Sequence, residues 1–295
     1  MATNQKKSSN SSGQKLAQIV AAKTHNKIKS SAVWAIALVC VVCIGVGFVF
    51  GYLTHDWLDP SVPLNNTGSN PDIIVDGGLS IHFLEQGTKY TGDIVYIKYG
   101  DTDILIDSGG AEIVSSNSNP APTIKAYLDN YCDDGILEYV IATHAHADHI
   151  LGFAGTSNSD GIFDYYADSI GTVIDFPKTN STTATYNRYL QKRQKLEDNG
   201  TEHYTALECW NAGTKTSGAR REWYLDDDVW FEILYNKYYV DSNVDENAYC
   251  VCIMLHYKND QFLFTGDLQN YNTTSNTAED DFITYYETHG GAWPL

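Results

Sequence analysis

The hydrophobic positions of the chain form one long apolar block followed by many short runs. The block covers residues 32–53 and contains no charged side chain. A helix rises about 1.5 Å per residue, so a block of this length crosses a hydrocarbon core about 30 Å thick. The pattern predicts a transmembrane helix over residues 32–53. A buried core helix is the alternative, but such helices are rarely apolar all round at this length.

A cleaved signal peptide competes with this interpretation. Its apolar region would be about 7–15 residues long and would end in a small-residue cleavage site such as Ala-x-Ala. No such site ends the block, so an uncleaved anchor is favoured. Residues 1–31 are rich in Lys, Ser and Asn and predict a solvated tail. Residues 54–78 contain Pro, Asn and Gly clusters and predict a linker.

From residue 79 the pattern changes to short β-branched or aromatic runs separated by turns, with two longer segments of helical character. Strands are predicted over residues 80–86, 93–99, 102–107, 137–143, 171–176, 229–235, 249–257 and 261–265. Helices are predicted over residues 122–132 and 182–199. Strands interspersed with helices predict a mixed α/β layered domain over residues 79–295.

The charge is unevenly distributed. Residues 1–53 hold six Lys and no Arg, Asp or Glu, which leaves 13 basic and all 37 acidic residues for the rest of the chain. Lysines on one side of the apolar block predict a single-pass protein of the cell membrane, with its N-terminus cytoplasmic and its domain outside. An acidic domain repels phosphate backbones at long range, so nucleic acid is a disfavoured partner. A phosphoester held directly by metal ions is not excluded.

The chemistry is concentrated in residues 143–150, THAHADHI, which follow the apolar run 137–143. His144 and His146 are two residues apart, so an extended turn can aim both rings at one ion. Asp148 and His149 follow on the next bend and can serve a second ion. A lone histidine is more often a core or loop residue, but three His and one Asp in six residues predict a metal site. Imidazole with carboxylate suits Zn²⁺ best, with Mn or Fe as alternatives.

The order His-x-His-x-Asp-His resembles the signature of the metallo-β-lactamase superfamily. Further segments match in order: TDILIDSGG at residues 102–110, ENAYCVCIMLHY at 246–257 and FLFTGD at 262–267. The opening run from residue 83, FLEQGTKYTGDIVYIKYG, looks like that of the ComEC-like branch. The resemblance spans residues 80–270.

The resemblance implies an αββα sandwich, two β-sheets packed together with helices outside. It implies His144 and His146 on one metal, Asp148 and His149 on a second, and a bridging carboxylate from Asp267. The family's Asp before the Gly pair falls on Asp107, which we interpret as a supporting residue that holds the histidine loop.

Two departures from the family pattern bear on the ligand set. The final histidine of the second metal follows a strand in the family, whereas His289 stands where a helix should end, so the chain resembles a C-terminally truncated form with an incomplete last strand and helix. The third ligand of the first metal should lie between His149 and Asp267, where only His203 and His256 are available. Either is more often a packed or exposed strand residue than a ligand. The first metal therefore has no clear third ligand, and the sequence is compatible with one ion or two.

These features predict a membrane-anchored metal-dependent hydrolase. Water on the metal would attack an ester, amide or phosphoester of a small-molecule substrate, with Asp148 orienting the water as well as ligating. The alternative is a catalytically inactive metal-binding receptor or scaffold of the same fold. A nuclease is disfavoured by the acidic domain.

The lysine asymmetry makes the orientation testable. Protease added to intact cells should digest residues 80–295, because the predicted orientation places the domain outside. The digest would be followed by immunoblotting with a tag at each end of the chain. Complete protection of the domain, with a cytoplasmic control protein also intact, would contradict the orientation.

Overall fold

The computed structural model describes residues 78–85, 90–110, 119–270 and 277–289. All of them belong to one unit, Ile73–Leu295. The predicted tail, the predicted membrane segment over residues 32–53 and nearly all of the predicted linker lie outside the described residues. Within the described ranges, no helix has both the length and the apolar character needed to span a bilayer.

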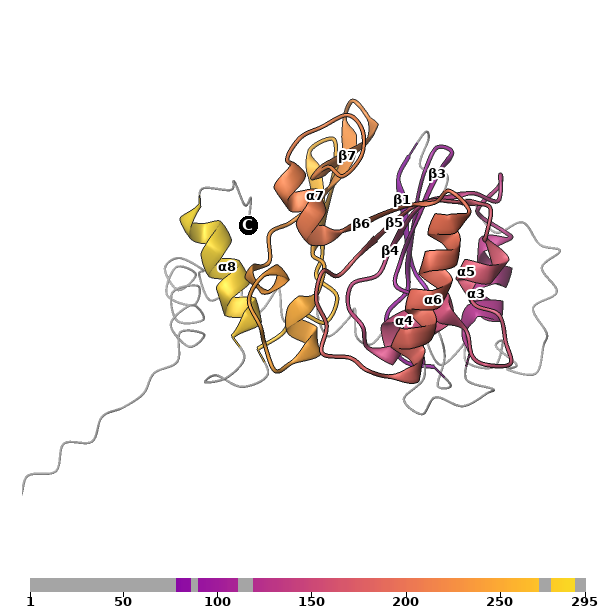
Figure 1. Ribbon diagram of the computed structural model, residues 1–295. Coiled ribbons are helices and arrows are strands. Elements are labelled where there is room, and N and C mark those ends of the chain that lie inside the picture. The colour runs from indigo at the N-terminus through magenta and orange to yellow at the C-terminus, as the bar shows by residue number, and fades with distance from the viewer. Residues whose placement is uncertain (1–77, 86–89, 111–118, 271–276, 290–295) are drawn as a thin grey trace, which may run out of the picture. The chain divides into compact units, whose positions relative to one another are not determined.

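Two β-sheets form the centre of the domain (Figure 1). The first has six strands in chain order, antiparallel from β1 to β3 and parallel from β3 to β6. Its strands are β1 (Ser80–Phe83), β2 (Val95–Tyr99), β3 (Thr102–Ile106), β4 (Leu137–Ile141), β5 (Ile170–Asp175) and β6 (Glu202–Thr205). The second sheet is antiparallel, in the order β10-β9-β8-β7. Its strands are β7 (Glu222–Asp226), β8 (Val229–Ile233), β9 (Ile253–Tyr257) and β10 (Asp260–Phe264).

Helices flank the sheets. The α-helices are α3 (Ala121–Leu128), α4 (Ala147–Ala154), α5 (Ile162–Tyr165), α6 (Ala184–Asp198), α7 (Ala206–Ala212) and α8 (Ala278–Thr288). Two 3₁₀ turns, η2 (Lys237–Tyr239) and η3 (Glu246–Tyr249), lie between β8 and β9. Figure 1 shows α3 to α6 together on the face of the first sheet that points away from the second.

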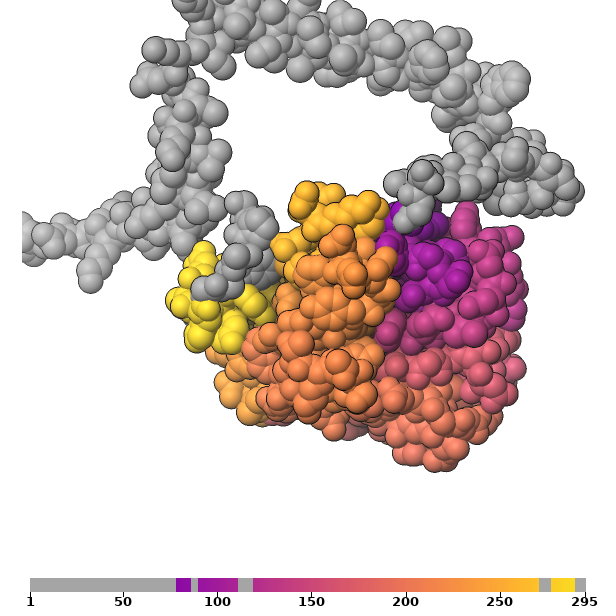
Figure 2. Space-filling view, turned by 90° about the horizontal axis from the view of Figure 1, so that it is seen from above, coloured from indigo at the N-terminus to yellow at the C-terminus, as the bar shows by residue number. Residues whose placement is uncertain are grey.

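The two sheets pack directly on each other. The ring of Tyr139 in β4 meets those of Trp223 in β7 and Phe231 in β8, with centroids 5.5 and 5.1 Å away. Figure 2 shows the orange surface of the second sheet against the indigo and magenta surface of the first. On the other face of β9, Phe282 of α8 joins a small cluster with Met254. The mixed α/β prediction is therefore confirmed.

The predicted strand over residues 249–257 is wrong in its first part. Residues 246–249 form the turn η3, and β9 begins only at Ile253. Asp245 caps this turn by accepting from the backbone N–H of Asn247. The amide of Asn236 then donates to the carbonyls of Ala248 and Cys250, at 2.8 and 3.0 Å. These side-chain bonds satisfy backbone groups that a strand would have paired in a ladder.

Several short elements have no counterpart in the predicted ones: strand β7 and the helices α4, α5 and α7. Helix α7 begins with a capping box between Thr205 and Glu208. Cys132 and Cys209 are both buried free thiols.

Gly92 sets how closely β2 approaches the histidine helix. A Cβ atom on Gly92 would lie 1.7 Å from the backbone oxygen of Asp148, and its φ is +81°. Gly135 has a similar φ of +71°, but a Cβ atom added there would have no other atom within 4 Å.

We expect Gly135→Ala to lower the free energy of unfolding by about 1–2 kcal/mol, the cost of a left-handed alanine. Gly92→Ala should lower it by about 1–3 kcal/mol more, because α4 must move. Urea denaturation of the full-length chain measures both; equal losses would contradict the close approach.

Candidate metal centre

The loop after β4 carries the histidines to the carboxyl edge of the parallel strands. β4 lies between β3 and β5, parallel to both, and α4 begins at Ala147. Ser108, which follows β3, is hydrogen-bonded to this helix. Its hydroxyl donates to the carbonyl oxygen of His149 at 2.9 Å and accepts from the backbone N–H of Phe153 at 2.8 Å. The helix therefore starts from a fixed position beside the end of β3.

The carboxylate of Asp107 ties three groups together. It accepts from the backbone N–H of Thr143 at 2.8 Å, from the Thr143 hydroxyl at 2.6 Å and from Nδ1 of His149 at 2.7 Å. Asp107 is buried and has φ +57°, a left-handed conformation that is uncommon outside glycine and tolerated by Asp. This conformation turns the carboxylate towards the histidine loop, which agrees with a supporting position rather than a ligand position.

These bonds determine the tautomer of His144. The Thr143 hydroxyl has a single proton, which it gives to Asp107, so it accepts from Nδ1 of His144 at 3.0 Å. Nε2 of His144 is then left without a proton. It lies 3.0 Å from Nδ1 of His146. Two ligands on one tetrahedral zinc, with Zn–N bonds of about 2.0–2.1 Å, stand at a similar separation.

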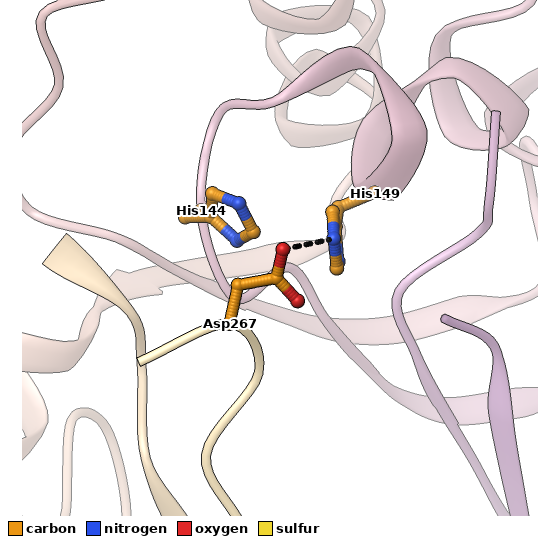
Figure 3. A group of neighbouring side chains, drawn as sticks. All are labelled: His144, His149 and Asp267. Carbon is orange, nitrogen blue, oxygen red and sulfur yellow. Dashed lines mark ion pairs between the residues drawn. The ribbon is translucent and has the colours of Figure 1, made fainter. Parts of the chain in front are cut away.

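His149 and Asp267 meet from opposite sheets (Figure 3). Nε2 of His149 lies 3.3 Å from Oδ2 of Asp267, which follows β10. That nitrogen is buried, and apart from this ion pair it has no hydrogen-bond partner among the described residues. Ligand atoms of His144, His149 and Asp267 all lie within 4.8 Å of one another. A divalent cation could take the place of the proton between His149 and Asp267 and bind the other converging ligand atom, so the residues present fit a metal ion.

The electrostatics of the group follow from burial and from the carboxylates. Burial lowers the pKa of His149, but Asp107 and then Asp267 outweigh it and raise the pKa to about 11. Burial, reinforced by the charges of His149 and His146, lowers the pKa of His144 well below its usual value. The hydrogen-bonding interaction with His149 is the main cause that lowers the pKa of Asp267. Without an ion, His144 is neutral and His149 is charged at neutral pH.

Asp148 lies in the first turn of α4, partly exposed. Its carboxylate is not part of the group formed by His144, His149 and Asp267. His146 joins that group through its contact with His144.

Asp93 is a neighbouring carboxylate that the sequence analysis missed. Burial raises its pKa, and Asp267, Asp107 and Asp148 raise it further, whereas the charge of His149 lowers it. The only signal in the sequence was its place just after Gly92, at the start of a strand.

The remaining candidate histidines lie elsewhere. Nε2 of His203 pairs with Asp175 at 2.9 Å, and Nε2 of His256 pairs with Glu232 at 3.1 Å. His289 is exposed at the end of α8. The described residues therefore bring no further imidazole to the centre.

A second acidic group, Asp103, Cys132 and Asp134, has metal-like spacing. Asp103 is already partnered there by Lys98 at 3.4 Å and by the Tyr96 hydroxyl. Burial raises the pKa of Cys132 to about 12, which keeps the thiol protonated. These residues form a structural network.

A pocket of about 250 Å³ opens beside the Asp107 network. Most of its lining is apolar and comes from both sheets: Phe83, Leu84, Ile94, Val95, Ile106, Leu263 and Phe264. Its polar side chains are Asp93, Asp107, Thr143 and Thr265, and no Lys or Arg is among the lining residues. The pocket offers an apolar group a place next to the centre.

Comparison with known proteins supports the superfamily. Residues 87–161, which include the histidine motif and Asp107, match the model of the Metallo-beta-lactamase superfamily. No curated protein sequence matches the chain. The superfamily consists typically of metal-dependent hydrolases, and the ComEC-like branch is a finer assignment than this match.

Three solved structures with low similarity to the chain illustrate the comparison. The metallo-beta-lactamase fold protein YhfI of Bacillus subtilis is 13% identical, with a TM-score of 0.34 over 60% of this chain and 55% of YhfI. A metallo-β-lactamase-like protein of Thermotoga maritima is 14% identical, with a TM-score of 0.38 over 70% of this chain and 91% of that protein. The short form of human tRNase Z is 12% identical, with a TM-score of 0.32 over 63% of this chain and 68% of that protein. The chain thus spans about half the length of YhfI.

The pKa of His149 makes metal binding a proton-release reaction. Because this pKa is about 11, His149 carries a proton at pH 7 that an ion must displace, whereas His144 has none to lose. We expect about one proton to be released at pH 7 when zinc binds at His149. Calorimetry in buffers of different ionisation enthalpy measures this number. Binding enthalpies that do not depend on the buffer would contradict it.

Proposed function

We propose that the chain is a membrane-anchored metal-dependent hydrolase of the ComEC-like branch of the metallo-β-lactamase superfamily. The observation that carries the proposal is the convergence of His144 and His149 from one segment with Asp267 from a distant one, around a buried ring nitrogen of His149. The superfamily match over residues 87–161 supports it. The anchor is the apolar block over residues 32–53, and the lysines before it support a domain outside the cell membrane.

The proposed ligands are His144, His146, Asp148, His149 and Asp267, and Zn²⁺ is the favoured ion, with Mn or Fe as alternatives. When bound, the metal supplies a water of lowered pKa and a positive charge for the developing oxyanion. The protein's own residues do the positioning. Asp107 holds the His149 ring through Nδ1, which aims Nε2 into the centre. Asp148, in the first turn of α4, would orient the attacking water as well as ligating.

The pocket indicates the class of substrate. Its apolar lining, with no Lys or Arg among the described residues that line it, favours a small neutral ester or amide with an apolar group. A phosphoester would depend on the metal alone for its charge, and a long nucleic acid would meet an acidic domain. We therefore propose a small-molecule ester or amide ahead of a phosphoester.

A metal-binding receptor or scaffold without turnover is the second candidate. The observation that favours it is the engagement of His203 with Asp175 and of His256 with Glu232, which leaves the centre with few protein ligands. Bound metal with no turnover of any ester, amide or phosphoester would establish this alternative.

Hydrolysis is tested with the full-length chain loaded with zinc. The double variant His144→Ala and His146→Ala removes two imidazole ligands, so it should lose about one ion and at least about 100-fold in hydrolysis of p-nitrophenyl acetate. His289→Ala is the matched control, because this histidine is exposed at the end of α8. Elemental analysis and initial rates measure the two effects. Unchanged metal content in the double variant, or equal loss in the control, would contradict the assignment.

A further inference from the structure

Asn247 is a buried side chain beside the histidine loop that the proposed mechanism leaves without a role. It lies in η3, is 8% exposed, and its backbone N–H donates to Asp245 at 3.2 Å. The same segment is joined to the histidine loop, because the backbone N–H of Val251 donates to the carbonyl of Thr143 at 2.9 Å. Hydrogen bonds on either side of Asn247 in the sequence therefore fix its position relative to the histidine loop.

The side chain of Asn247 reaches the His144 ring. Yet Oδ1 of Asn247 is buried and has no hydrogen-bond partner in the described part of the chain. His144 has no proton to offer it, because Nδ1–H is used by Thr143 and Nε2 carries none. A buried carbonyl oxygen thus faces the bare nitrogens of the centre without a donor.

A bound cation would give the Asn247 oxygen and the histidine nitrogens the partner that they lack. Nε2 of His144 and Nδ1 of His146 lie 3.0 Å apart. Apart from His149, which the proposal assigns to the second ion, the described residues bring no further imidazole to them. Amide carbonyl oxygens are common ligands of divalent ions. We propose that Oδ1 of Asn247 is the third protein ligand of the ion held by His144 and His146. This inference rests on the proposed metal centre and adds to it a ligand that comes from the second half of the chain.

An oxygen in this position changes the preference for the ion. Two imidazoles and an amide oxygen form a harder ligand set than three imidazoles, so the preference for Zn²⁺ over Mn²⁺ is smaller. Replacement of the oxygen by a third imidazole, as in Asn247→His, should widen that preference. Replacement by a carboxylate, as in Asn247→Asp, keeps an oxygen ligand and adds a charge that only a bound cation neutralises.

The test is metal affinity of the full-length chain, measured by calorimetry with Zn²⁺ and with Mn²⁺. Asn247→Ala should weaken binding of one ion by at least about 10–100-fold. Asn247→Asp should bind at least as tightly as the parent chain. Its melting temperature should be lower than that of the parent without metal and should rise more when Zn²⁺ is added. Melting temperatures also show whether each variant folds.

Asn180→Ala is the matched control. The Asn180 side chain donates to the Asn243 carbonyl at 2.8 Å and accepts from the hydroxyl of Tyr249 in η3 at 3.4 Å, so it supports the same segment through other contacts. This variant should bind both ions like the parent. Equal affinity of Asn247→Ala and the parent would overturn the inference, and so would weaker binding by Asn247→Asp than by Asn247→Ala. An equal loss in Asn180→Ala would assign the effect to the loop and would also overturn it.

The binding measurements separate this inference from the proposed hydrolysis. A parent chain that binds metal through Asn247 but turns over no substrate supports the ligand and refutes catalysis. A parent chain that hydrolyses esters while Asn247→Ala keeps its full metal affinity supports catalysis and refutes the ligand. A parent chain that binds neither ion refutes both.

Discussion

The carboxylate of Asp107 is the interaction on which the geometry of the centre depends. It accepts three hydrogen bonds at 2.6–2.8 Å from Thr143 and His149, and so joins the end of β3, the end of β4 and the start of α4. Through the Thr143 hydroxyl it also determines which nitrogen of His144 carries the proton. A change at this one carboxylate would affect both rings at once, because it removes the direct hydrogen bond to His149 and the group that orients the Thr143 hydroxyl against His144.

The centre concentrates acceptors in a buried space. Neutral His144, the amide oxygen of Asn247 and the carboxylate of Asp267 gather around His149 with few protons among them. Such a set is unfavourable without a positive charge, and in the absence of metal the proton on His149 supplies part of it. Metal binding and protonation therefore compete for the same nitrogen. This competition makes the affinity for the ion depend on pH.

The two sheets contribute different parts of the centre. The first sheet carries the histidines and Asp107, whereas the second carries Asp267 after β10 and Asn247 before β9. The ring contacts of Tyr139 with Trp223 and Phe231 hold the sheets together well away from the ligands. The centre exists only when this packing is complete, so an ion that bridges the two sets of residues also stabilises the contact between the sheets. The apolar pocket beside the centre is lined by residues of both sheets for the same reason.

The sequence alone determined the features that local pattern encodes. Alternating and β-branched runs predicted a mixed α/β domain, and three His with one Asp in six residues after a buried run predicted where the metal chemistry lies. The apolar block over residues 32–53 stays a prediction, because it lies outside the described residues. Tertiary structure decided what depends on distant partners. Asp93 and Asn247 were not among the predicted site residues, and only the packing of the two sheets shows that they lie near the centre. His203 and His256 were candidate ligands until Asp175 and Glu232 were found beside them. A residue's chemistry can be read from its type and spacing, but its role is set by the groups that burial brings against it.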